Sequence, residues 1–241
     1  MATNYGNGLP IVTHGLVFAF DPKDPNCWDG SSTYAKDLVT GAQGDFQSTI
    51  TASLDRNGLD FDGVDDYVDF DTYEPACLFG TEYTLEVWGR TDSTPDDGSY
   101  AAFFGTGWPM QMYQVADNKV EIYMKTTDGS YYVNAQKTSA VLGADDEYWC
   151  YTLTRTDNGD GSSTSSTFTQ YINGQQDSTF TRNNSVNRTS DASGIHIGNW
   201  FSGHNNYTFG GTIGPVRVYD RKLEASEVLR NYNVQKIRFG V

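Results

Sequence analysis

The sequence predicts an all-β fold: an antiparallel two-sheet jelly-roll sandwich with one short helix near the C-terminal end. Many short segments alternate apolar and polar residues, turn-forming residues separate these segments, and a single stretch has helical spacing. The composition agrees, because 14% of the 241 residues are aromatic and ring side chains favour strands. A parallel α/β sheet is excluded, since it requires a crossover helix between successive strands.

The first 14 residues predict an extended N-terminal arm, because they show little periodicity and contain several Gly, Asn and Thr residues. Such a segment is expected to become ordered only against another surface. The jelly-roll domain is predicted to span 15–233. It opens with the apolar run Leu16–Phe20, a strand buried on both faces, which ends before Pro22 because proline cannot donate to a ladder. A long loop is expected from there to Gly44.

Alternation of apolar and polar side chains predicts the next strands. Leu59–Asp62 and Tyr67–Asp71 flank an acidic turn, and the apolar members of both strands should face the core. The segment 82–90 is expected to form a half-buried strand. Its apolar face carries Tyr83, Leu85 and Val87, and its polar face carries Glu82, Thr84 and Glu86.

A meander, a hairpin and the helix complete the predicted fold. The meander strands are expected at 101–105, 110–115, 120–125 and 131–135. The later strands are expected at 149–154, 168–172, 175–181 and 209–219. Asn173-Gly174 predicts a two-residue hairpin turn, because both residues tolerate positive φ. Helical spacing predicts one helix at about 224–232, and residues 234–241 are expected to form a C-terminal tail.

Charge and cysteine content exclude several classes of protein. Sixteen basic residues against 31 acidic ones give a net charge of −15, which repels phosphate backbones and anionic membranes. We therefore expect no nucleic-acid binding and no membrane insertion. Cys27, Cys77 and Cys150 are odd in number and lack metal-ligand spacing, so they are expected to be reduced. The first residues lack a secretory signal pattern, which predicts a soluble protein made inside a cell.

Five segments, taken in order, resemble the concanavalin A-like jelly-roll family, and specifically its laminin G-like (LamG) branch. They are Gly15–Asp21, Leu59–Val68 with the motif Phe-Asp-Gly-x-Asp-Asp-Tyr-Val, Tyr83–Trp88, Trp149–Thr154 and Gln170–Gly174. The resemblance covers about 15–233 and implies a concanavalin A-like sandwich. The chain departs from the family pattern at Gly214-Pro215, where the family carries an acidic residue, and at the helix start, where Glu224 replaces Ser or Thr.

The two ends of the chain resemble a narrower group of proteins within this family. Ile11–Asp21, Val228–Asn233 and Arg238–Val241 resemble LamG-like virion proteins of large tailed bacteriophages, which implies a virion component. The leading hypothesis is a non-enzymatic capsid decoration or cement protein on the outer head surface, made in the host cytoplasm. It would dock on the major capsid protein, or on another virion protein, through its arm and tail. Dimers and trimers are both compatible with such a module.

Two other functions fit the same resemblance: a tail-fibre or baseplate adhesin that binds host-surface carbohydrate, and a polysaccharide hydrolase. Glu82 and Glu86 share a strand face but are separated by roughly 13 Å, whereas glycosidase carboxylates lie about 5–9.5 Å apart. Asp69 and Asp71 are closer, at roughly 6.6 Å, but no third acidic residue follows at the same spacing on that strand face. His196 alternates with isoleucines and is expected on the outer face of a strand. We therefore predict no catalytic residue.

One candidate binding site is an acidic turn. Asp62, Asp65 and Asp66 flank a tight glycine turn, and clustered carboxylates are ligands that Ca²⁺ prefers. The LamG resemblance implies that such modules often carry calcium, so a structural Ca²⁺ is predicted at these three residues. The alternative is an ordinary solvated turn.

The second candidate site is aromatic. Sugar binding requires ring faces that stack on the apolar faces of sugars, beside amides and carboxylates that meet the hydroxyl groups. Several Trp and Tyr residues lie in or beside predicted loops, and asparagines surround Trp200. The predicted glycan site consists of Trp200, His204, Asn205 and Tyr207. The alternative is that these rings pack at the edge of the core.

Overall fold

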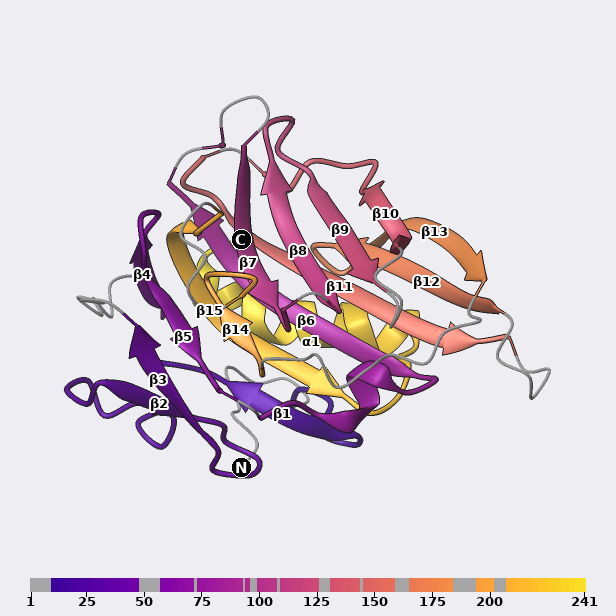
Figure 1. Ribbon diagram of the computed structural model, residues 1–241. Coiled ribbons are helices and arrows are strands. Elements are labelled where there is room, and N and C mark those ends of the chain that lie inside the picture. The colour runs from indigo at the N-terminus through magenta and orange to yellow at the C-terminus, as the bar shows by residue number, and fades with distance from the viewer. Residues whose placement is uncertain are drawn as a thin grey trace.

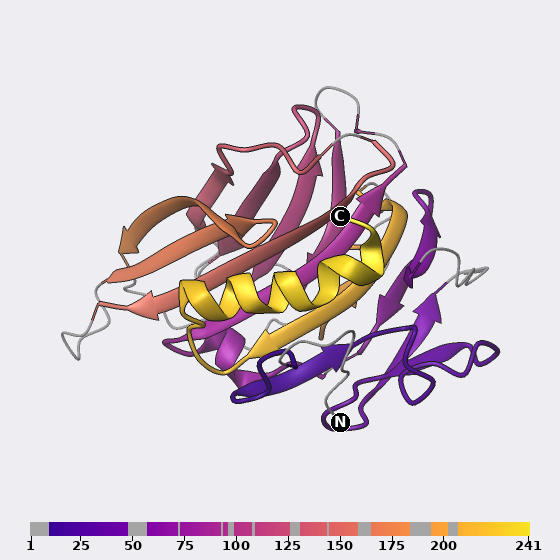
Figure 2. The same ribbon diagram turned by 180° about the vertical axis from the view of Figure 1, so that it is seen from behind.

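The computed structural model consists of two antiparallel sheets packed face to face, with one helix lying across the outer face of one sheet (Figures 1 and 2). It confirms the predicted all-β sandwich. The residues that the structure describes are 10–47, 57–71, 73–92, 94–95, 99–107, 109–125, 131–143, 145–158, 165–183, 194–201 and 207–241. Within these ranges, no helix is long and apolar enough to cross a membrane.

The first sheet has seven strands and contains both ends of the domain. Its order is β1-β15-β6-β11-β12-β13, and β4 also pairs with β15. The strands are β1 (Leu16–Phe20), β4 (Leu59–Asp62), β6 (Tyr83–Thr91), β11 (Tyr148–Asp157), β12 (Ser165–Ile172), β13 (Gln175–Asn183) and β15 (Gly210–Tyr219). The predicted hairpin turn between β12 and β13 is confirmed, because Asn173 and Gly174 both have positive φ, 51° and 74°.

The second sheet has eight strands in the order β10-β9-β8-β7-β14-β5-β3-β2. They are β10 (Tyr131–Lys137), β9 (Val120–Lys125), β8 (Met110–Val115), β7 (Tyr100–Gly105), β14 (His196–Ile197), β5 (Tyr67–Asp69), β3 (Gln43–Gln47) and β2 (Tyr34–Lys36). Strands β2 and β3 occupy part of the predicted long loop. They have no apolar alternation of their own, and β3 forms because its backbone pairs with β5.

The core lies between the two sheets and consists mainly of rings and branched side chains. The four residues expected to face inward from β4 and from the segment that starts with β5 are all buried, namely Leu59, Phe61, Val68 and Phe70. Rings from the two sheets meet edge to face across this layer: Phe18 with Phe70 at 5.1 Å and Phe103 with Trp149 at 5.3 Å between centroids. A 3-10 turn, Ala76–Phe79, precedes β6.

The helix α1 runs over Ala225–Phe239, so the predicted tail at 234–241 is wrong. Its buried stripe continues through Asn231 and Gln235. Because these two residues are polar, the apolar pattern stops about two turns before the helix does. At its start the Glu227 carboxylate accepts the Glu224 N–H at 2.9 Å. At its end Gly240 adopts a left-handed conformation with φ 73°.

The last turn of α1 fastens the helix to the sheet. Phe239 stacks on Trp88 of β6 with ring centroids 4.4 Å apart. Arg238 pairs with both oxygens of Asp21 at 2.7 and 2.9 Å, and both side chains are almost fully buried. Segments more than 200 residues apart in sequence are thereby joined.

The predicted free arm is also wrong in its described part, residues 10–14. Ile11 and Val12 are buried, and the Val12 N–H donates to Asn231 of α1 at 2.8 Å. The Tyr219 hydroxyl donates to the Val12 carbonyl at 3.1 Å, and Arg230 donates to the Pro10 carbonyl at 2.8 Å. Residues 1–9 lie outside the described residues. Residues 10–14 therefore form hydrogen bonds with the domain itself and are not a free arm.

Because α1 covers the outer face of the seven-stranded sheet (Figure 2), β6 is buried on both faces and not on one as predicted. Beneath the helix, Glu86 of β6 is fully buried and accepts a hydrogen bond from Arg217 of β15, which is its cross-strand partner. The second Glu86 oxygen accepts from the Asn231 amide at 3.0 Å. Cys150 lies on the same covered face beside Trp88 and Phe239, and burial raises the pKa of its thiol well above its ordinary value.

Candidate functional site

The outer face of the eight-stranded sheet carries a cluster of tyrosines, which we call the tyrosine platform: Tyr100, Tyr113, Tyr123 and Tyr207. Their ring centroids lie between 5.1 and 6.4 Å apart in edge-to-face pairs. Three of these rings come from the adjacent strands β7, β8 and β9, whose alternate residues enter the core. Tyr113 is buried, and the other three are half-buried, so each of these three keeps part of its surface in solvent.

Trp200 lies beside the platform but is itself buried, with 4% of its surface exposed. Its ring packs against Phe201 at 5.6 Å and Tyr207 at 6.4 Å. Its backbone crosses β7, because a Cβ at Gly105 would lie only 2.4 Å from the Trp200 Cα. The structure thus brings Trp200 and Tyr207 together, and Tyr207 supplies the accessible ring. The other two predicted glycan-site residues, His204 and Asn205, lie outside the described residues.

Polar groups are embedded in the platform. The Tyr123 hydroxyl donates to Glu121, and Lys137 lies 3.4 Å from the same carboxylate. The Tyr113 hydroxyl donates to Gln111 Oε1 at 2.9 Å, and the buried Gln111 Nε2 has no acceptor among the described residues. Burial, and then the bond to Glu121, raise the pKa of Tyr123. The platform therefore combines ring faces with an amide, a carboxylate and an ammonium group.

The sequence reasoning missed most of this platform. Tyr113 and Tyr123 lie on predicted strands, where a ring is ordinarily assigned to the core. A signal was present, because Gln111-Met112-Tyr113 and Glu121-Ile122-Tyr123 repeat one pattern on adjacent strands. In each segment, a polar residue and a tyrosine flank an apolar residue, Met112 or Ile122, that faces the core.

His196 is on the outer face of β14, as predicted, but other side chains cover it completely. It lies between the rings of Tyr67 and Phe201, with centroids 6.1 and 6.3 Å away, and its Nε2 is 3.4 Å from Asp69. Burial lowers the pKa of His196, and Asp69 opposes this effect. Burial therefore favours the neutral form of the imidazole.

The acidic turn between β4 and β5 gathers the three predicted calcium ligands. One carboxylate oxygen each from Asp62, Asp65 and Asp66 lies within 4.8 Å of the others. Calcium–oxygen distances of about 2.3–2.6 Å place two ligand oxygens at most about 5 Å apart, so the three residues fit one ion. Burial, followed by the charges of neighbouring aspartates, raises the pKa of Asp66. Thr208 donates to the Gly63 carbonyl at 2.7 Å and joins this turn to the segment that carries Tyr207.

Glu82 and Glu86, considered for hydrolysis, do not form an accessible pair. Glu86 is buried beneath α1 with Arg217, whereas Glu82 is exposed and accepts a hydrogen bond from Thr156 at 2.9 Å. Asp69 lies beside His196.

This two-sheet sandwich, with an accessible ring-lined face on one sheet, has the architecture of a lectin-like domain. The family model described as the concanavalin A-like lectin/glucanases superfamily (Laminin_G_3) matches residues 62–229. The chain belongs to this family.

Solved structures with the same fold come from several kinds of protein. The Trypanosoma rangeli sialidase in complex with sialic acid is 17% identical, with a TM-score of 0.68 over 99% of this chain and 36% of that one. Domain 4 of the extracellular arabinanase AbnA from Geobacillus stearothermophilus, in complex with arabinotriose, is 15% identical, with a TM-score of 0.59 over 90% of this chain and 98% of that one.

The receptor binding domain of botulinum neurotoxin C/D mosaic serotype is 10% identical, with a TM-score of 0.65 over 94% of this chain and 54% of that one. Our chain spans only about a third of the sialidase chains. At these identities the likeness shows the fold. No curated protein matches the chain in sequence.

Proposed function

We propose that this protein is a non-catalytic carbohydrate-binding domain that holds a glycan on the tyrosine platform. One observation carries the proposal: three half-buried tyrosines, Tyr100, Tyr123 and Tyr207, cluster on one sheet face, where the Tyr123 hydroxyl donates to Glu121. Ring faces stack on the apolar faces of sugars, and amide and carboxylate groups meet the hydroxyls.

The similar structures support this proposal at the level of the fold. The alignment with domain 4 of the arabinanase includes nearly the whole of that domain, which was solved in complex with arabinotriose. The comparison favours a sugar ligand for a domain with this fold. The location of the site on this chain is inferred from the platform residues alone.

Binding to a broad panel of oligosaccharides, followed by calorimetry on each hit, tests the proposal. We expect Tyr123→Ala and Tyr207→Ala to weaken binding at least tenfold, because each removes a stacking surface. Tyr34→Ala is the matched control, since Tyr34 is also half-buried but lies on β2, at the far edge of the same sheet. Absence of binding across the panel, or an equal loss in Tyr34→Ala, would contradict the proposal.

The absence of catalysis is part of the proposal. It is supported by the position of Glu86, whose charge is compensated by Arg217 beneath α1. Incubation of the protein with the glycans that it binds, followed by an assay for new reducing ends, tests it. Release of reducing sugar at a rate that depends on Asp69 would favour the hydrolase alternative.

The virion role stays a prediction that depends on the sequence resemblance of the chain ends. Docking through those ends is limited in the described residues, because 10–13 and 234–239 contact the domain itself. Quantitative mass spectrometry of purified phage particles tests the role. Hundreds of copies per particle would support capsid decoration, whereas a few copies would support a tail adhesin.

We also propose that the acidic turn binds a structural calcium ion through Asp62, Asp65 and Asp66. Burial and then the charges of neighbouring aspartates raise the pKa of Asp66, and an ion there would offset both effects. Calcium at 100 times its Kd should stabilise the fold by about 2.7 kcal/mol, measured as a higher melting temperature after removal of EDTA. Asp65→Asn should abolish this gain, and the exposed control Asp45→Asn should keep it. An unchanged melting temperature of the wild type would contradict the proposal.

A further inference from the structure

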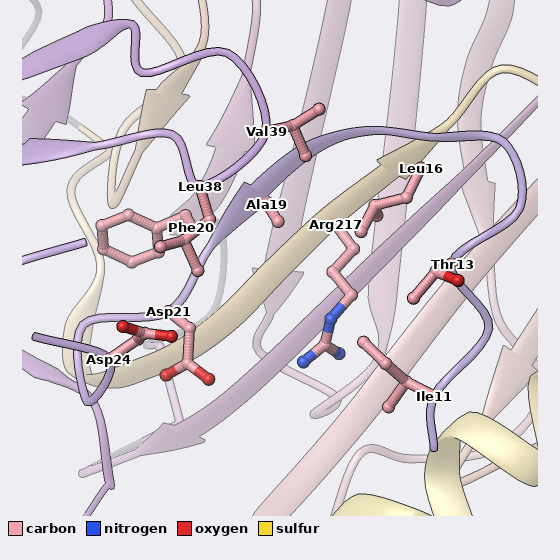
Figure 3. A pocket seen from close by; sticks show the side chains of 10 residues that line it. All are labelled: Ile11, Thr13, Leu16, Ala19, Phe20, Asp21, Asp24, Leu38, Val39 and Arg217. Carbon is pink, nitrogen blue, oxygen red and sulfur yellow. The ribbon is translucent and has the colours of Figure 1, made fainter. Parts of the chain in front are cut away.

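A cavity of about 310 Å³ opens on the opposite side of the molecule from the platform, beside β1 of the seven-stranded sheet (Figure 3). It lies between the N-terminal segment and the turn that follows β2. The residues that line it are Ile11, Thr13, Leu16, Ala19, Phe20, Asp21, Asp24, Leu38, Val39 and Arg217. A volume of this size equals the share of about ten water molecules and lies at the lower end of the range for ligand pockets.

Two cross-strand neighbours contribute to the cavity. Ala19 of β1 is in register with Arg217 of β15, and its small side chain leaves the space above the sheet open. Arg217 has only 3% of its side chain exposed, and its guanidinium points into the cavity (Figure 3). Its Nη1 donates to Glu86. Within the described part of the chain, Nε and Nη2 donate to no protein acceptor, and neither is among the fully buried unpaired atoms.

The charges around the cavity are nearly balanced. Glu86 compensates Arg217, and Arg238 engages both oxygens of Asp21. Asp24 accepts two hydrogen bonds from Asn26 through Oδ1, and its Oδ2 has no donor among the described residues. A second carboxylate beside Arg217 would be repelled by Glu86. The cavity thus offers donors at one end and an acceptor at the other, without an uncompensated positive charge.

We propose that this cavity binds an uncharged, hydroxyl-bearing molecule of the size of one sugar ring. An oxygen of the ligand accepts from the unfilled Arg217 donors, and a hydroxyl donates to Asp24. The apolar C–H face of the ring packs on the aliphatic walls formed by Ile11, Leu16 and Leu38. This inference does not depend on the tyrosine platform, which lies on the other sheet.

Ligand-observed NMR with the full chain tests the proposal. The probes are free neutral hexoses and pentoses at millimolar concentration, with uronates and aliphatic amino acids as charged comparisons. We expect at least one neutral sugar to bind and the charged probes not to bind. Ala19→Leu fills the space above the sheet and should weaken binding at least tenfold. Arg217 is left intact, because its loss would leave Glu86 buried and unpaired.

Further variants keep the outcome decisive. Val39→Trp blocks the rim from an exposed position and should also abolish binding, so the test does not depend on the folding of Ala19→Leu. Val141→Trp is the matched control, because Val39 and Val141 are 45% and 52% exposed and Val141 lies away from the cavity. Tyr123→Ala should leave the binding of free sugar unchanged, which separates this site from the platform. Binding of charged probes only, no binding of any neutral sugar, or full binding by Val39→Trp would overturn the proposal.

Discussion

The outer faces of the two sheets differ far more than their sequences do. Strands in both sheets alternate core residues with polar or aromatic ones. On the seven-stranded sheet, α1 covers the alternate residues and buries a charged pair, Glu86 and Arg217 (Figure 2). On the eight-stranded sheet no helix covers the corresponding face in the described residues, and Tyr100, Tyr123 and Tyr207 remain accessible. The presence or absence of α1 over a face therefore determines which polar residues stabilise the fold and which can contact a ligand.

The largest expected effect comes from removal of residues 234–241. The deletion removes the stacking of Phe239 on Trp88 and the buried partner of Asp21. Loss of a packed Phe costs about 3–5 kcal/mol, and breaking a buried ion pair costs about 3–5 kcal/mol. The free energy of unfolding in urea should therefore fall by at least ~5 kcal/mol. Deletion of residues 240–241 alone is the control, and an unchanged urea midpoint after the longer deletion would restore the tail interpretation.

The next effect compares a covered charge with an exposed one. Arg217→Met leaves Glu86 buried without a cation and should lower the free energy of unfolding by about 3–5 kcal/mol. Lys137→Met removes a 43% exposed cation from the eight-stranded sheet and should cost about 0–1 kcal/mol. Equal losses in chemical denaturation would show that the helix does not separate the two faces energetically.

A smaller effect compares two tyrosine hydroxyls. Tyr219→Phe removes a donor to the Val12 carbonyl beneath the N-terminal segment and should cost about 1–2 kcal/mol. Tyr207→Phe lies on the platform, keeps the stacking ring, and should change the free energy of unfolding by less than about 0.5 kcal/mol. Thermal melts of both variants measure the difference. A Tyr207→Phe variant that is destabilised as much as Tyr219→Phe would reverse the assignment of the faces.

The smallest effect concerns the start of the covering helix. Hydrogen bonds from Arg221 lower the pKa of Glu227 to about 2 against partial desolvation. Because the folded pKa lies below the unfolded one, this carboxylate stabilises the fold above pH 4.5 and loses its contribution as pH falls toward 2. Glu227 is partly exposed, so Glu227→Gln should cost about 1 kcal/mol or less at pH 7. The cost should shrink between pH 5 and 3, and a cost that stays constant over this range would contradict the assignment.

Local patterns predicted much of the fold. Strands β8 and β9 have the predicted bounds, because strict alternation with apolar core residues determines both their type and their ends. Strands β2 and β3 escaped prediction because long-range pairing creates them. The last turns of α1 escaped it because Asn231 and Gln235 occupy buried positions, and these polar residues interrupt the apolar stripe.

The candidate sites were predictable only in part. The acidic turn is local in sequence, and its three carboxylates do converge. Tyr207 was identifiable as a ring beside a loop, whereas the repeated pattern around Tyr113 and Tyr123 does not say by itself that their face is uncovered. Whether a strand ring faces solvent depends on which sheet the helix covers. That choice is made by contacts such as Phe239 with Trp88, which no local pattern contains.

The pairing of β1 with β15, together with the bond from Val12 to Asn231, has a consequence for biosynthesis. Because Leu16 pairs with Tyr219, β1 is synthesised long before its partner strand, a separation typical of slow-folding, high contact-order topologies. The nascent chain therefore carries β1 as an unpaired edge strand until β15 has been made. During that interval the exposed strand edge is open to aggregation and proteolysis.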